Sequence, residues 1–408
     1  MNVLIATDHI FMRHSAVVYD TYAFDYGFFR DYLATFPRAT VLCRMNHADR
    51  KSLPHGASRS DGEGLKFAGI RPCRRATWFV AARLLAARRL QRVMADVNAV
   101  VVRVPSELGW LAARAAVRHG KPYMVELVSD PEAAFLNSGD SPGYRLLAGL
   151  WAGRTRRLVR HAAVVSYVNG TVLPSKYPAS PGTPWDVVSS IRLSQADLSG
   201  PRTFTDFRRP IRLVHVGTLT PRKRIQDLLE ACRLLRQQGT RAELHIVGDG
   251  PERSRLTDMA ERLGLEGAVH FHGHLAGRSA LHAVLDYADL FLLASASEGL
   301  PRAVIEAMGR GLPVVAANSP GIEELVDDDE LFAVGDTRML VARVEQLARM
   351  PNRLTALSHS NVQKSGCFRS EVLSPKRAAL YGSLAAYAAC IAIPASQQAR
   401  PPAHPNPI

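Results

Sequence analysis

The stretch "DLFLLASASEGLPRAVIEAMGRGLPVVAA", residues 289–317, contains a strand, a turn, a helix start and a second strand. The apolar run "DLFLLAS" predicts a buried strand, and "LPVVAA" predicts the next one. Pro301 lies between them where a helix would begin, a position that tolerates proline because its N–H would have no partner there. Apolar strands that alternate with helices are typical of a parallel sheet covered on both faces.

Two glutamates, Glu298 and Glu306, stand on either side of this helix start. The first turn of a helix presents free N–H groups and a partial positive charge, which favour a bound anion, although Arg302 also lies there. A rise of ~1.5 Å per residue plus the turn puts the two carboxylates on the order of 10 Å apart. This is at or beyond the upper limit for an acid/base pair acting on one glycosidic bond. This separation suits two carboxylates that bind hydroxyls at opposite ends of a ligand whose central group is negatively charged.

The rest of the chain repeats the alternation of strands and helices. Strand-like runs occur at 2–6, 39–43, 99–103, 122–127 and 162–168, and a second series begins at 211–219. We therefore expect an α/β protein with two Rossmann-like, doubly wound domains that face a cleft, and ligands at the carboxyl ends of the strands. Residues 45–75, rich in Arg, Gly, Ser and Pro, predict a long loop.

The domain boundaries follow from where the periodic patterns stop. The predicted parts are a first domain at 1–193, a linker at 194–210, a second domain at 211–365, a C-terminal helix at 366–393 that packs back on the first domain, and a disordered tail at 394–408.

The composition narrows the class of protein. Of the formal net charge of +14, most lies in the first half, where residues 1–200 carry 26 Lys and Arg against 15 Asp and Glu. Such a basic half indicates either an anionic partner or a role of the charges in solvating the domain. Five cysteines without a C-x-x-C pair, and no apolar run approaching the length of a membrane span, predict a cytoplasmic protein. "MNVLIATDHI" predicts a first strand and not a signal peptide.

Four segments, taken in order, resemble one family. The stretch from Glu298 to Glu306 resembles the E-x7-E motif of retaining GT-B glycosyltransferases, glycosyltransferase family 4, of the type that builds bacterial surface polysaccharides. "LVHVGTLTPRKRIQDLLEACRLL" resembles the family's phosphate-binding strand, loop and helix, "LHIVGDGPERSRL" its second glycine turn, and "VHFHGHL" the short strand before its base pocket. The match covers roughly 211–340. It implies a hexosyltransferase that uses a nucleoside diphosphate sugar, by default a UDP-sugar, as co-substrate and requires no other cofactor.

The resemblance also implies roles for residues. Glu298 would bind donor-sugar hydroxyls, Glu306 the ribose hydroxyls, and Lys223 the diphosphate. The family's arginine after Gly217 is replaced by Thr218, and Arg222 is the candidate to supply that charge. The predicted nucleotide-sugar-binding set is Gly217, Arg222, Lys223, Gly250, Gly299, Leu300, Arg302 and Glu306.

The first domain departs from the family, in which it binds the acceptor. The first loop, after strand 2–6, has no glycine before Gly27, and the middle strand is not followed by a histidine. Glu107 and Asp130 come at or just after strand ends, and Asp130 joins Glu298 and Lys223 as a candidate catalytic residue. Each could orient an acceptor hydroxyl, or Glu107 could cap a helix and Asp130 stabilise a turn.

Three histidines, His270, His272 and His274, alternate on one strand. A metal site is not expected there, because no carboxylate or cysteine neighbours them in the sequence.

A basic helix predicts a further partner. Within residues 76–95, Arg88, Arg89 and Arg92 share one arc with Trp78 and Leu85, while Phe79, Leu90, Val93 and Met94 point toward a core. Such an arc is typical of a helix on an anionic membrane, although high arginine content can merely solvate a domain. Together with the basic segment 154–161, it predicts a peripheral protein at the inner face of the plasma membrane, with a glycan or lipid-linked sugar as acceptor.

Other classes fit less well. A nicotinamide oxidoreductase should carry G-x-G-x-x-G after its first strand, and "ATDHIFMRHS" does not. A nucleic-acid-binding protein would suit the charge but lacks interleaved basic and aromatic residues. A catalytically weak relative that binds nucleotide sugars or assists assembly stays an alternative, although it would not need both glutamates.

Overall fold

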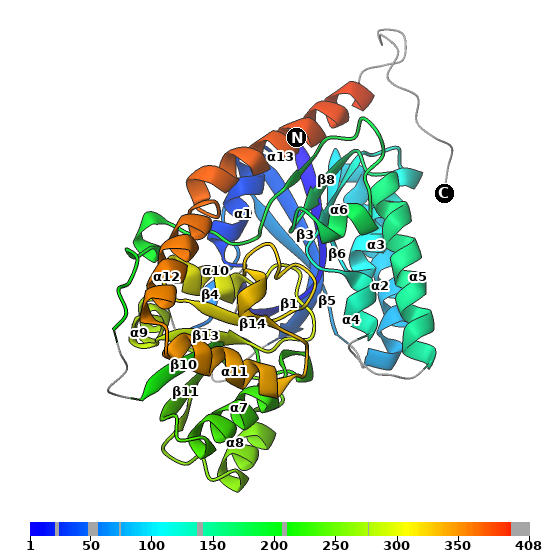
Figure 1. Ribbon diagram of the computed structural model, residues 1–408. Coiled ribbons are helices and arrows are strands. Elements are labelled where there is room, and N and C mark those ends of the chain that lie inside the picture. The colour runs from blue at the N-terminus through cyan, green and yellow to red at the C-terminus, as the bar shows by residue number, and fades with distance from the viewer. Residues whose placement is uncertain are drawn as a thin grey trace. The chain divides into compact units, whose positions relative to one another are not determined.

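The computed structural model describes residues 1–20, 24–47, 56–72, 75–136, 142–205, 210–275 and 277–392. The chain divides into two compact units (Figure 1). Unit 1 comprises residues 1–132, 145–188 and the C-terminal part from 374, and unit 2 comprises residues 133–144 and 189–373. The predicted tail at 394–408 lies outside the described residues. Each unit has an α/β fold built on its own sheet, as the sequence predicts.

Unit 1 is built on a mainly parallel sheet. Its parallel strands, in spatial order, are β5 (Leu65–Ile70), β3 (Arg38–His47), β1 (Asn2–His14), β6 (Ala99–Val104), β7 (Tyr123–Leu127), β8 (Val164–Tyr167) and β9 (Trp185–Val187). Two short strands add antiparallel pairs to this sheet: β2 (Val17–Asp20) pairs with β1, and β4 (Ser58–Arg59) pairs with β2. The core strands are buried along their whole length, as a two-sided sheet requires.

Two predicted loops are wrong in this unit. The first loop after residue 6 is instead a continuation of β1 to His14, followed by the hairpin partner β2, with a register irregularity between Ala6 and Ile10. The predicted loop at 45–75 contains β5, an edge strand parallel to β3. Lys66 and Gly69 interrupt the apolar pattern of β5, which is an edge strand, and Thr7, Asp8, His9 and Arg13 interrupt the pattern of β1.

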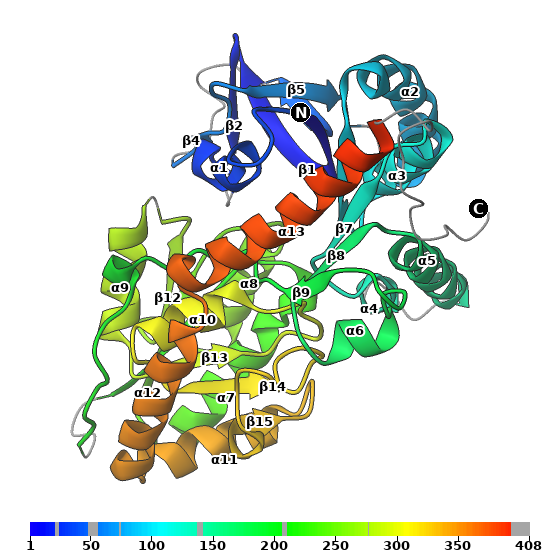
Figure 2. The ribbon, with the colours of Figure 1, turned by 90° about the horizontal axis from the view of Figure 1, so that it is seen from above.

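Helices of this part of the chain are α1 (Tyr26–Leu33), α2 (Arg75–Asp96), α3 (Glu107–Arg118), α4 (Pro131–Leu136), α5 (Pro142–Arg160), α6 (Val172–Lys176) and the long C-terminal α13 (Ser370–Ala392). Figures 1 and 2 show α2, α3 and α5 side by side along unit 1. From α13, Leu380, Tyr381 and Leu384 are buried in the same apolar core as strands β1 and β3.

A buried polar cluster fixes α13 to this sheet. The Glu126 carboxylate on β7 accepts hydrogen bonds from the hydroxyls of Tyr32 and Tyr381, each at 2.9 Å, and pairs with the guanidinium of Arg103. The two tyrosine rings stack with centroids 4.7 Å apart. A charge inside a core is tolerated only when it is paired in this way.

Unit 2 is built on a parallel sheet. Its strands, in spatial order, are β12 (Val269–Gly273), β11 (Ala242–Val247), β10 (Ile211–Val216), β13 (Leu290–Leu293), β14 (Val314–Ala317) and β15 (Leu331–Phe332). Its helices are α7 (Ile225–Gln237), α8 (Arg253–Arg262), α9 (Arg278–Tyr287), α10 (Arg302–Gly309), α11 (Thr337–Ala348) and α12 (Pro351–Gly366). One face packs with α7, α8 and α11 in a single core, and α9 and α10 contact strands β10, β13 and β14.

The segment predicted to be a linker is anchored to unit 2. Arg202 inserts its guanidinium among main-chain carbonyls, donating from Nε to Arg310 at 2.7 Å, from Nη1 to Ala288 at 2.8 Å and from Nη2 to Leu285 at 3.1 Å. Apart from the short 3-10 helix η2 (Gln195–Asp197), side-chain hydrogen bonds hold the described part of this segment, so the sequence showed no periodic pattern here.

Within the part of the chain that the structure describes, no helix is both long and apolar enough to span a membrane.

Candidate active site

The candidate site lies at the carboxyl ends of two neighbouring strands. Strands β10 and β13 are hydrogen-bonded partners in the middle of the sheet of unit 2, so the loops that follow them lie together. The loop after β10 contains the short 3-10 helix η3 (Pro221–Lys223), and the loop after β13 contains Glu298. The main-chain N–H of Ala296 donates to the carbonyl of Arg222 at 2.9 Å, which joins the two loops directly.

Lys223 and Glu298 form the central contact of this site. Lys223 Nζ lies 2.6 Å from Glu298 Oε1, and Arg222 Nη1 lies 3.4 Å from Glu298 Oε2. Burial alone would raise the pKa of Glu298, but the charges of Lys223 and Arg222 outweigh it and leave this pKa below its ordinary value. Glu298 is therefore an anion at neutral pH that accepts hydrogen bonds.

Three glycines shape the loops around Lys223. Gly248, with φ of +127°, lies so close that a Cβ would be 2.0 Å from the carbonyl oxygen of Gly217. A Cβ at Gly250 would be 2.5 Å from the carbonyl oxygen of Leu219. A Cβ at Gly217 would lie 3.4 Å from Cε of the Lys223 side chain. The predicted residues Gly217 and Gly250 thus allow the two turns to pack against each other beneath Lys223.

His215 is a residue of this site that sequence reasoning missed. Its side chain is fully buried on β10, its Nδ1 lies 3.0 Å from the carbonyl oxygen of Leu292, and its Nε2 has no hydrogen-bond partner. Nε2 faces Gly217, at 3.1 Å from the position of a Cβ there. Burial and the charge of Lys223 lower the pKa of His215 to about 4, so the ring is neutral. The available signal was a histidine in an otherwise apolar strand, "LVHVG".

The start of α10 provides the second part of the site. Pro301 occupies the N-cap position and its own side chain cannot cap the helix, so among the described residues the first N–H groups of α10 have no capping side chain. Leu300 is buried just before it, and Arg302 is exposed in the first turn. Gly299 completes the turn between Glu298 and Leu300.

Glu306 is half-buried on α10, and among the described residues no donor reaches its carboxylate within hydrogen-bonding distance. Burial raises the pKa of Glu306 above its ordinary value, and Arg302 and Arg278 oppose this rise. The guanidinium of Arg278 is bound directly by another carboxylate, that of Asp197. Among the described residues, Glu306 therefore has an acceptor carboxylate without a hydrogen-bond partner.

The two candidates from unit 1 have protein partners instead. Asp130 is buried, with Oδ1 accepting from the Tyr177 hydroxyl at 2.6 Å and from the main-chain N–H of Glu132, and Oδ2 lying 2.6 Å from Lys176 Nζ. These contacts favour the turn role for Asp130 over the catalytic one.

Glu107 is fully buried in the first turn of α3 and pairs with Arg83 at 3.2 Å and Arg154 at 3.6 Å. The cap of this helix comes from Ser106 and from Asp8, whose carboxylate accepts from the main-chain N–H groups of Glu107 and Leu108. Asp8 was not predicted, because its partner lies 99 residues further along the chain.

Known proteins resemble the part of the chain that contains the candidate site. Residues 205–363 match the family model described as "Glycosyl transferases group 1". Protein CapJ of Staphylococcus aureus is 26% identical over 336 residues, which is 82% of each chain. The putative colanic acid biosynthesis glycosyltransferase WcaL of Escherichia coli (strain K12) is 31% identical over 215 residues, or 50% of this chain and 47% of that protein.

Solved structures share the fold. Anabaena HepE, crystallised with UDP, superposes with a TM-score of 0.63 over 94% of this chain and all of that one, at 17% identity. Sucrose-phosphate synthase of Thermosynechococcus elongatus superposes with a TM-score of 0.67 over 95% and 99% of the two chains, at 15% identity. Residues 205–363 thus match a glycosyl transferases group 1 domain, and the chain shares the GT-B fold of these solved structures.

Proposed function

We propose that this protein is a retaining hexosyltransferase of family 4 that moves a sugar from a UDP-sugar to a lipid-linked sugar acceptor. The pathway we propose is the assembly of a surface polysaccharide such as capsule, exopolysaccharide or lipopolysaccharide. Relatives named for colanic acid and amylovoran biosynthesis support the pathway, and the fold shared with HepE, solved with UDP and with UDP-glucose, supports the donor.

One observation carries the proposal. Lys223 and Glu298 are paired at 2.6 Å beside the start of α10, where Pro301 offers no side-chain cap, and Glu306 follows on the same helix without a hydrogen-bond partner among the described residues. A cation and free N–H groups suit a diphosphate, and two acceptor carboxylates suit the hydroxyls on either side of it. A nucleoside diphosphate sugar has these groups in this order.

The chemistry follows from these charges. As the bond from the anomeric carbon to the diphosphate breaks, negative charge grows on the leaving oxygen, and Lys223, Arg222 and the α10 N-terminus would stabilise it. Glu298 would hold sugar hydroxyls and stabilise the positive charge that develops on the ring. The protein supplies the stabilising cations itself, so we propose that the nucleotide sugar is the sole small molecule required besides the acceptor.

A basic and apolar surface on unit 1 supports the lipid-linked acceptor and a peripheral position at the plasma membrane. On α2, Arg88, Arg89 and Arg92 are exposed, and Leu85 beside them is 50% exposed, whereas Leu90 and Met94 face the core. The side chains of Trp78 and Phe79 lie outside the described residues. An exposed surface that mixes arginine and leucine is typical of a helix that lies on an anionic bilayer.

The neighbouring helices continue this surface. A cavity of about 460 Å³ lies between α3 and α5 and is lined by Trp110, Arg114, Arg154 and Arg157. The guanidinium groups of Arg114 and Arg154 lie 4.7 and 4.6 Å from the Trp110 ring centroid. Leu146 and Leu150 of α5 are exposed close by in the sequence. We propose that this surface holds the anionic and apolar parts of the lipid-linked acceptor.

The proposal is tested in two steps. A thermal-shift panel of nucleotides and nucleotide sugars should show the largest stabilisation with UDP and one UDP-sugar, because a ligand at 100 times its dissociation constant adds about 2.7 kcal/mol. Proton NMR of the product formed with that UDP-sugar should show the anomeric configuration of the donor. A panel without any stabilising nucleotide would contradict the donor, and an inverted anomer would contradict the retaining mechanism.

A further inference from the structure

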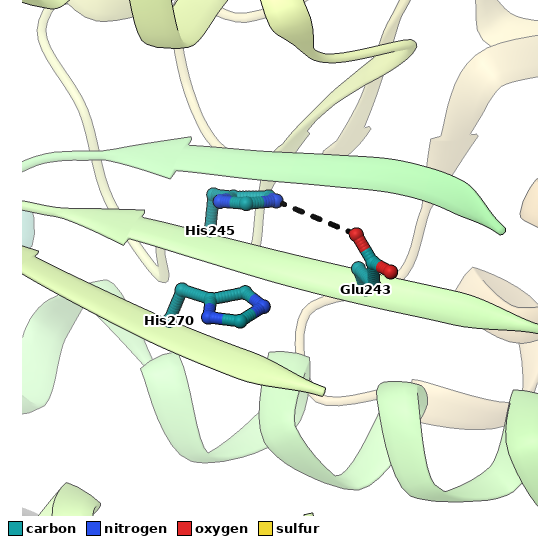
Figure 3. A group of neighbouring side chains, drawn as sticks. All are labelled: Glu243, His245 and His270. Carbon is teal, nitrogen blue, oxygen red and sulfur yellow. Dashed lines mark ion pairs between the residues drawn. The ribbon is translucent and has the colours of Figure 1, made fainter. Parts of the chain in front are cut away.

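A group of histidines and one carboxylate lies at the edge of the sheet in unit 2, apart from the loops described above. Glu243 and His245 are two residues apart on β11, so their side chains are on the same face, and His270 is the register partner of His245 on the edge strand β12 (Figure 3). This face is opposite the one that Leu244 and Ile246 bury against α7 and α8.

These three side chains are close enough to share one ion. One potential ligand atom from each of Glu243, His245 and His270 lies within 4.8 Å of the other two, and His245 Nε2 is 4.0 Å from Glu243 Oε2. Tetrahedral bonds of about 2.0–2.2 Å require ligand atoms about 3.4 Å apart. Glu243 and His270 are only partly buried and can close this gap by side-chain rotation.

His245 has a buried atom that lacks a partner. The residue is 8% exposed, and its Nε2, the atom that faces Glu243, is buried without a hydrogen bond. A buried ring nitrogen without a partner is costly, since it has lost its water and gained no contact. The neighbouring carboxylate and imidazole make a metal ion the partner that would satisfy all three groups together.

A fourth histidine orients His245. Nδ1 of His245 lies 3.0 Å from Nε2 of His272. If Nδ1 donates its proton in this contact, Nε2 of His245 carries the free lone pair and points toward Glu243. Histidine ligands of metal ions are commonly oriented in this way by a second group.

We propose that Glu243, His245 and His270 form a binding site for one divalent transition-metal ion, Zn²⁺ or an ion of similar preference, with water as the fourth ligand. His272 is a positioning residue, and an imidazole and carboxylate set of this kind is typical of zinc. The ion would join β12 to β11 and stabilise the edge of the sheet. The site does not depend on the proposed transfer reaction.

The test measures metal binding directly on full-length protein without a histidine tag. Titration with ZnCl₂ should show one ion per chain, and Co²⁺ in place of Zn²⁺ should give the strong visible absorption of a tetrahedral complex. Glu243→Gln should abolish both signals. This variant is the most informative one. Glu243 is partly exposed and glutamine has nearly the same shape as glutamate, so we expect the fold to be retained. His272→Gln should weaken Zn²⁺ binding about 10–100-fold.

His274→Gln is the matched control, because His274 is an exposed histidine just after β12 and outside the group. It should bind Zn²⁺ as wild type does, and UDP binding should be the same in all three variants. Equal Zn²⁺ affinity in wild type and Glu243→Gln, or a loss in His274→Gln as large as in Glu243→Gln, would overturn the proposal. Failure of UDP binding in wild type would instead contradict the proposed function and leave the metal result standing.

Discussion

Lys223 Nζ and Glu298 Oε1 are 2.6 Å apart although 75 residues separate them in the sequence. They meet because β10 and β13 are adjacent parallel strands, whose carboxyl ends bring the two loops together. Each neutralises the charge of the other. A diphosphate would take over the contact with Lys223 and leave the carboxylate free for sugar hydroxyls.

Replacement of Glu298 should affect the sugar more than the nucleotide. Glu298→Gln removes a charged acceptor, worth about 1.5–3 kcal/mol per hydrogen bond, so kcat should fall at least about tenfold. UDP affinity should stay within about threefold of wild type, because Lys223 is then released from its partner. Initial rates and calorimetric UDP titrations measure the two effects. A UDP affinity that falls as much as kcat does would contradict the separate sugar role.

Replacement of Glu306 should have a different effect. The ribose is common to every nucleotide, so Glu306→Gln should weaken UDP, GDP, ADP and the nucleotide sugar alike, each by roughly 1.5–3 kcal/mol. Wild type and variant are compared by titration with each ligand. Superimposable titration curves for the two proteins would mean that Glu306 does not bind the ribose.

His215 should make the stability of unit 2 depend on pH. Its folded pKa of about 4 lies below the ordinary value of 6.5, so as pH falls the unfolded chain takes up the proton first and the free energy of unfolding decreases between pH 6.5 and 4. The variant His215→Asn places an amide N–H near the carbonyl of Leu292 and does not titrate. Between pH 7 and 4.5, wild type should lose roughly 2–3 kcal/mol more than the variant. Urea unfolding at both pH values measures this difference, and parallel losses would contradict a neutral, buried His215.

The exposed arginines of α2 should bind anionic membranes. Wild type should sediment with liposomes that contain anionic lipid, less so at high salt, and little with neutral liposomes. The triple variant Arg88→Gln, Arg89→Gln, Arg92→Gln should lose about 3 kcal/mol of this binding, since each basic residue contributes about 1 kcal/mol.

A matched triple variant in unit 2 controls for net charge. Arg255, Arg262 and Arg338 are also exposed, and their replacement by Gln removes the same charge from other helices. This control should sediment as wild type does. If both triple variants lose binding equally, the contact depends on total charge and not on α2.

Much of unit 2 could be predicted from the sequence because its signals are local. Strand, turn and helix start follow one another within 289–317, and Lys223 and Glu298 each come directly after a strand that its apolar residues reveal. The structure places these two in contact and gives Gly217 and Gly250 close packing that explains why they carry no side chain.

The features that could not be predicted depend on contacts between residues that are distant in the sequence. The partners of Asp130 and Glu107 come from α5, α6 and α2, and their carboxylates looked available only because those contacts are distant in the sequence. The His245 group was missed for the same reason. Its carboxylate comes from β11, the neighbouring strand, and parallel register is not visible in the residues around His270.

The central claim is that Lys223 binds the diphosphate of the donor, and calorimetry with two ligands tests it most directly. Wild type and Lys223→Ala are each titrated with UDP and with uridine. The account predicts that the variant loses at least about tenfold in UDP affinity, as expected for one charge-assisted contact, while its uridine affinity stays unchanged. An equal loss for uridine and UDP, or no loss for UDP, would contradict the account, because Lys223 would then support the loop or the Glu298 pair and not the diphosphate.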